Sequence, residues 1–241
     1  MKTPNKTLLI ILLIFAFTGQ ANSQTQFMGW LSTFQNYKVN NKFGFYFDGQ
    51  WRSTAQVQQM NTLLLRPGIN IYLSPVFTAT AGYAFIPQQR ISAGVTGYLP
   101  EHRVWEQVVF THKVKAHHRP VATVAHRVRL EQRFIPRHHA EGNSLVKDGH
   151  RSAGRLRYFT RGVVPLGSRR DRGMFAAVQN EIFFHTANGG SFDQNRAYVA
   201  AGYKMNAALD LEMGYLNQYI SAGGGASTNN HILQVATYIR L

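Results

Sequence analysis

The sequence lacks cysteine, has few acidic residues and contains no apolar run long enough for a membrane-spanning helix. The absence of cysteine excludes disulfides, thiolate metal sites and a cysteine nucleophile. The longest apolar run, Leu8 to Phe17, has ten residues, whereas a transmembrane helix needs about 20. Charged residues make up only 15% of the chain and aromatic residues 12%, a combination that suits a protein with a lipid-facing surface.

The first residues indicate export from the cytoplasm. Lys2 and Lys6 are the only charges before residue 24, and the apolar run 8–17 follows them. The small residues Ala21 and Ser23 then provide a cleavage motif, so the segment has the three parts of a secretory signal peptide. We expect residues 1–23 to be a signal peptide and residues 24–241 to form a single exported domain.

The charge balance is strongly basic, with 26 Lys and Arg against 11 Asp and Glu and a formal net charge of +15. An exported protein rarely meets nucleic acid, so we expect no nucleic-acid partner. The anions available to it are phosphorylated outer-membrane lipids, including lipopolysaccharide, and acidic polysaccharides.

Most of the chain beyond residue 24 alternates between apolar and polar residues in segments of about ten, which is the pattern of membrane-spanning strands. In 43–52 the apolar face holds Phe43, Phe45 and Trp51, and the polar face includes Asp48 and Arg52. Segments 124–134, 208–219 and 233–241 alternate in the same way. The fold predicted is an all-β, antiparallel up-and-down transmembrane β-barrel in the outer membrane.

Eleven segments carry this pattern, near 26–37, 42–52, 60–73, 76–86, 102–115, 121–134, 151–164, 174–186, 194–204, 208–219 and 230–241. Bacterial single-chain barrels have even strand numbers. We therefore expect ten to twelve strands, with twelve slightly favoured and 90–98 as the missing strand. Short connections at 40–41, 74–75 and 205–207 alternate with long loops at 87–101, 135–150 and 220–229.

The last segment ends at Leu241. It resembles the C-terminal signal that outer-membrane barrels present to the barrel-assembly machinery, except that leucine replaces the usual aromatic residue. A soluble periplasmic β-protein is the alternative, because alternation alone does not say which face points inward. In that fold the apolar face would be inside and the charged face would meet water.

Arginines and carboxylates on the polar faces are the most distinctive chemistry. We expect them to form a polar network in the lumen, made of Arg127, Arg129, Glu131, Arg133, Arg155, Arg157, Arg161, Glu106, Glu181, Arg196 and Glu212. One interpretation is an ion-pair network that fills the interior. The other is a basic, porin-like lumen that selects anions.

Short motifs along the chain resemble a known family. They are Leu65-Arg66-Pro67-Gly68 with Gly82-Tyr83; 101–107, beginning Glu101-His102-Arg103; Arg127–Phe134; Arg155-Leu156-Arg157-Tyr158; Asn180–Phe183; Asp193–Arg196 with Gly202-Tyr203; Gly214-Tyr215; and Asn230-His231. In this order they resemble the bacterial domain-of-unknown-function family numbered 2490, which looks like outer-membrane barrels. The resemblance brings no catalytic residue and no cofactor.

Two groups of histidines invite other functions. His150 and Ser152 have the spacing of a His-x-Ser pair on one strand face, as in outer-membrane lipid hydrolases, with Asp148 as the only adjacent acid. His117-His118 and His138-His139 suggest metal binding, but they flank one strand and would lie at its opposite ends. We expect no metal and no cofactor. The leading prediction is a non-enzymatic outer-membrane barrel, structural or binding and passing small anionic solutes; a His-x-Ser hydrolase is an alternative.

Overall fold

The computed structural model describes residues 23–167, 172–187, 189–222 and 227–241. It has eleven strands: β1 (Ser23–Lys38), β2 (Phe43–Ser53), β3 (Met60–Tyr72), β4 (Phe77–Ser92), β5 (Val95–Ala116), β6 (Arg119–Glu141), β7 (Ser144–Pro165), β8 (Gly173–His185), β9 (Phe192–Lys204), β10 (Leu209–Ile220) and β11 (Ser227–Arg240). A single 3-10 turn, η1 (Ala55–Val57), joins β2 to β3. Within the described ranges, no helix has the length and apolarity to cross a membrane. The expected signal peptide lies almost wholly outside the described residues.

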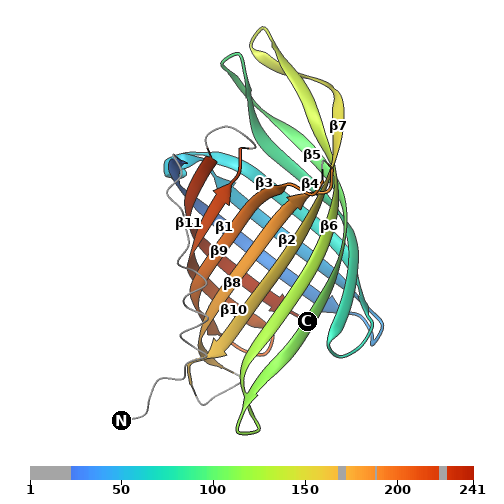
Figure 1. Cartoon of the computed structure of the whole chain (residues 1–241), viewed down its shortest axis with the longest axis vertical. Coiled ribbons are helices and arrows are strands. Elements are labelled where there is room, and N and C mark those ends of the chain that lie inside the picture. Colours follow the sequence, from blue (N-terminus) through green and yellow to red (C-terminus); the bar gives the residue numbers. More distant parts are fainter. Residues whose placement is uncertain (1–22, 168–171, 188, 223–226) are drawn as a thin grey trace.

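The strands form one closed barrel, and each strand pairs with its neighbours in the sequence (Figure 1). Every consecutive pair is antiparallel, whereas β1 and β11 close the barrel in parallel, from Ser23 beside Ser227 to Asn36 beside Arg240. The parallel closure follows from the strand number, because an odd number of alternating strands brings the first and last together in the same direction. The all-β barrel prediction is confirmed, but the preference for twelve strands is wrong.

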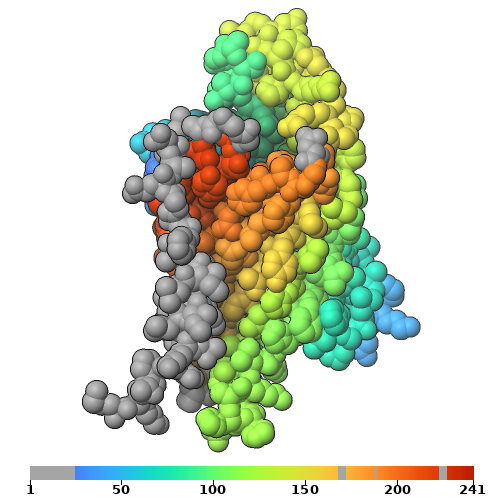
Figure 2. All heavy atoms as spheres, in the orientation of Figure 1, coloured from blue at the N-terminus to red at the C-terminus, as the bar shows by residue number. Residues whose placement is uncertain are grey.

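Segment 90–98 is the tip of a hairpin and adds no twelfth strand. β4 runs to Ser92, the turn at Ala93 and Gly94 has positive φ, and β5 starts at Val95. The β6–β7 hairpin is extended in the same way, with its turn at residues 142–143. Figures 1 and 2 show these two hairpins standing above the barrel wall. The prediction of long loops at 87–101 and 135–150 is therefore wrong: cross-strand pairing continues through residues assigned to loops because they lack clean alternation.

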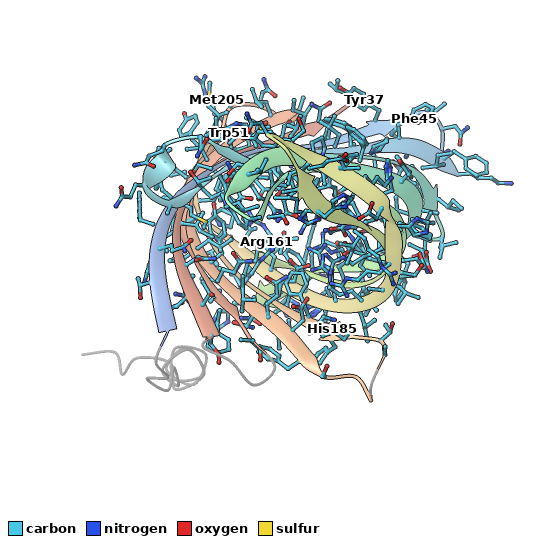
Figure 3. The ribbon with its side chains drawn as sticks, turned by 90° about the horizontal axis from the view of Figure 1, so that it is seen from above. Tyr37, Phe45, Trp51, Arg161, His185 and Met205 are labelled. Carbon is cyan, nitrogen blue, oxygen red and sulfur yellow. The ribbon has the colours of Figure 1, made fainter. Side chains whose placement is uncertain are left out.

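The alternation sorts the side chains into a polar interior and an apolar exterior. On β2, Phe43 and Phe45 are exposed and Asp48 is buried; on β6, Val128 is exposed and Arg129 is buried. Figure 3 looks along the barrel from above, with Arg161 inside the ring of strands and Phe45 at its edge. The exposed apolar side chains come from all the strands. Two buried apolar clusters, one around Trp30 and one around Trp105, also lie inside the barrel.

Candidate functional site: the arginine-lined interior

Glu131 is the centre of the polar interior. It is fully buried, and its carboxylate accepts hydrogen bonds from Arg157 Nη1 at 2.6 Å and Arg155 Nη2 at 2.7 Å, both on the adjacent strand β7. Arg103 on β5 also donates to it, at 3.3 Å. Two further guanidiniums lie at the limit of an ion pair, Arg129 at 3.9 Å and Arg66, which comes from the non-adjacent strand β3, at 4.0 Å. One carboxylate thus connects side chains from β3, β5, β6 and β7.

Other carboxylates extend this network along the barrel. Asp48 binds Arg66 at 2.9 Å, and Glu101 binds both Arg103 and Arg133 at 2.7 Å. Glu181 joins Arg127 and Arg157, each at 2.7 Å. Glu212 on β10 pairs with Arg161 on β7. Charge-assisted pairs of this kind are the strong hydrogen bonds of protein interiors. The paired side chains are buried and meet inside the barrel, so they fill the lumen at this level.

Trp105 packs beside the network, and it explains two glycines of the family motifs. Its indole is fully buried, and the guanidinium of Arg129 lies 4.7 Å from the ring centre. Gly68 and Gly82 are register partners beneath the ring. A Cβ atom at either position would come within 3 Å of Trp105, at 2.9 and 2.7 Å. The two glycines therefore leave the space that the indole occupies.

The structure places ten of the eleven predicted network residues with their side chains in the interior. Glu106 is the exception and corrects the prediction. Its neighbours Trp105 and Gln107 face inward, so Glu106 points outward, where it is exposed and accepts a hydrogen bond from Gln132 at 2.9 Å. The mistake came from assigning charge to the inner face, although the parity of β5 is set by Arg103 and Trp105.

A chamber of about 280 Å³ lies in the lumen toward the end that carries the extended hairpins. Among the described residues, its wall includes seven arginines and a single carboxylate, that of Asp193. The seven are Arg52, Arg66, Arg103, Arg133, Arg155, Arg157 and Arg196. Amide side chains, including Gln194, Gln218 and Asn230, complete the polar lining. The chamber is therefore a strongly basic compartment inside the barrel.

The ring of Trp30 packs against the guanidinium groups of two of these arginines. The Cζ atom of Arg52 lies 4.1 Å from the centre of the Trp30 ring, and that of Arg196 lies 5.1 Å from it. Arg52 donates to Gln50 Oε1 through Nε at 3.1 Å. Arg196 also stacks over Phe183 at 4.7 Å. Both guanidiniums are thus held by aromatic faces at the chamber wall.

A second cavity, of about 450 Å³, lies at the other end of the barrel. Its lining includes the basic residues Lys113, Arg172, Lys204 and Arg240, and one acid, Asp210, which pairs with Arg240 at 2.6 Å. It shares no lining residue with the chamber. The arginine–carboxylate network and Trp105 lie between the two.

His150 and Ser152 do not form the arrangement that a hydrolase needs. They share the outer face of β7, but the described residues show no hydrogen bond between them, and the His150 ring instead packs edge-on against Phe134 at 5.5 Å. Asp148, the candidate for orienting the histidine, pairs with His139 at 2.5 Å. A nucleophile must lie within hydrogen-bond reach of its base, and His150 and Ser152 are not paired in this way among the described residues.

The paired histidines lie far apart. His117 and His118 form the turn between β5 and β6, whereas His138 and His139 lie near the far end of β6. The described part of the chain contains no group of three or more His, Cys, Asp or Glu residues that could hold a metal ion.

Sequence reasoning missed several residues of the site: Trp30, Asp48, Arg52, Arg66, Glu101, Arg103, Trp105 and Asp193. The polar face of 43–52 already contained Asp48 and Arg52, and the family motifs contained Arg66, Glu101 and Arg103. These were available signals. The two tryptophans gave no such signal in the sequence, because an inward tryptophan on a polar face breaks the alternation.

Comparison with known proteins identifies one family. A family described as "Protein of unknown function (DUF2490)" matches residues 27–230, which is most of the chain. No curated protein and no solved structure matches.

Proposed function

We propose a function for this chain, which belongs to the DUF2490 family of proteins of unknown function. It is a non-enzymatic outer-membrane barrel that binds small anionic solutes in its arginine-lined chamber. The observation that carries this proposal is the chamber wall, with seven arginines against one carboxylate. Rings of arginine favour anions in barrel lumens. The outward apolar side chains, such as Val199 and Met213, support residence in a membrane, because water would disfavour so continuous an apolar exterior.

Two measurements test this function together. Cell fractionation is expected to recover the protein in the outer membrane, in a form that needs detergent for extraction. Purified barrel is expected to bind small anions in titration calorimetry and to bind no small cations. Recovery in the soluble periplasm, or an absence of anion binding, would contradict the proposal.

The same geometry predicts that the barrel does not conduct as an open porin does. Glu131, Trp105 and their partners are buried between the two cavities, and no residue lines both. We expect planar bilayers that contain the protein to show no discrete conductance steps of porin size. Large, stable conductance steps in wild-type protein would show that the network leaves an open path. The proposed function would then be the passage of anions and not their binding.

A further inference from the structure

The seven arginines of the chamber differ in their partners. Five of them form ion pairs with carboxylates: Arg66 with Asp48, Arg103 and Arg133 with Glu101, and Arg155 and Arg157 with Glu131. Arg52 and Arg196 form no ion pair with any described residue. Asp48 attracts Arg52 and Glu181 attracts Arg196, but neither carboxylate comes within ion-pair distance, so neither guanidinium has a direct carboxylate partner among the described residues.

Burial makes the absence of a direct ion pair costly for Arg196. Its relative exposure is 8%, and its Nε atom is buried without a hydrogen-bond partner. A buried charge without a partner is strongly unfavourable. Asp193, the only carboxylate among the described lining residues, does not relieve it, since Asp193 pairs with Arg155 at 3.4 Å. The chamber wall thus carries more positive than negative charge at close range.

The two guanidiniums are also held in place. Both lie over the Trp30 ring, and Gln50 binds Arg52 while Phe183 supports Arg196. Fixed donors lose little freedom when a ligand binds, which favours affinity. Neutral amides nearby, such as Asn230, whose Oδ1 is buried and unpartnered, offer further polar contacts to a bound solute.

We propose that the chamber is a binding site for a small dianion, which Arg52 and Arg196 hold beside Trp30. Two unpaired guanidiniums match two negative charges, and a chamber of about 280 Å³ admits a small solute. Inorganic phosphate and dicarboxylates share this chemistry, and guanidinium groups bind both in bidentate fashion. This inference rests on the proposed anion-binding function and names its ligand class and its residues.

The test is calorimetric titration of the purified barrel in neutral detergent, with succinate, inorganic phosphate and acetate as separate probes. Wild-type protein is expected to bind succinate, phosphate or both at least about ten-fold more tightly than acetate. Arg196→Gln is expected to weaken dianion binding by about ten-fold or more, and Arg52→Gln with Arg196→Gln to abolish it. These estimates follow from losing one or two charge-assisted contacts.

Two variants control for net charge and for the geometry of the guanidinium group. Arg119→Gln removes one positive charge at the exposed turn between β5 and β6 and is expected to leave dianion binding unchanged. Arg52→Lys retains the charge and is expected to retain part of the affinity. The mobility of unheated samples on gels shows whether each variant has folded.

The outcomes separate this inference from the function on which it rests. Equal affinity for succinate, phosphate and acetate, or undiminished dianion binding by the folded double variant, would overturn the dianion site and leave anion binding elsewhere in the lumen. Absence of all anion binding by wild-type protein would overturn both. Preference for phosphate over succinate, or the reverse, supports the site and identifies its natural ligand type.

Discussion

Replacing Glu131 with glutamine is expected to destabilise the barrel by about 3–5 kcal/mol, the cost of removing one partner from a buried ion pair. The variant keeps the volume of the side chain and removes only its charge. Arg155, Arg157 and Arg103, which donate to this carboxylate, would then repel one another in the interior. Urea unfolding in detergent, followed by tryptophan fluorescence, measures the change, since Trp105 is buried beside the network.

Glu106→Gln provides the matched control. It is the same substitution on the neighbouring strand, but Glu106 is exposed on the outer face and its described partner is the amide of Gln132. The change is not expected to destabilise the barrel, because a charge on the lipid-facing wall that we propose is itself unfavourable. If the two variants unfold at the same urea concentration, the network around Glu131 does not stabilise the barrel.

The contrast between the two glutamates also shows what the sequence determines. Within one strand, alternation assigns parity, and parity correctly separated Arg127, Arg129, Glu131 and Arg133 from Val128 and Leu130. It failed at Glu106 because β5 carries a tryptophan inside and a carboxylate outside. A residue's charge is thus a weaker guide to its face than its position relative to the other residues of the strand.

Contacts between non-adjacent strands cannot be predicted in this way. Arg66 on β3 and Glu131 on β6 are separated by two strands, and their side chains approach because the curved wall turns both into the same interior. The registers of all the intervening strand pairs determine that approach. For the same reason the chamber, whose residues come from both the first strands and the last, was not predictable residue by residue.

The extended hairpins escaped prediction for a local reason. Segments 87–101 and 135–150 contain prolines, glycines and consecutive polar residues, which are typical of loops. Beyond the barrel wall a strand no longer separates an interior from an exterior, so its pairing no longer demands alternation. Backbone pairing alone continues β4 with β5 and β6 with β7 to their turns.

Arginine in place of Val199 tests the membrane location itself. Val199 is 55% exposed on β9, and its register partners Val178 and Tyr215 are also exposed on the outer face. In a lipid bilayer, an outward arginine near the midplane is expected to destabilise the barrel by about 2–4 kcal/mol. On a surface that faces water, the same substitution would be nearly neutral. Unfolding of the protein from lipid vesicles measures the difference.

The comparison position is Ile91, near the tip of the β4–β5 hairpin that rises above the barrel wall in Figure 1. It is 67% exposed, so Ile91→Arg introduces the same charge at an apolar site outside the proposed lipid belt. Its cost in vesicles is expected to be about 0–1 kcal/mol, because the penalty for arginine falls toward and beyond the interface. A large penalty at Val199 with a small one at Ile91 follows only if lipid surrounds the barrel wall. Equal effects at both positions would mean that water covers the wall, and the outer-membrane proposal would fail with them.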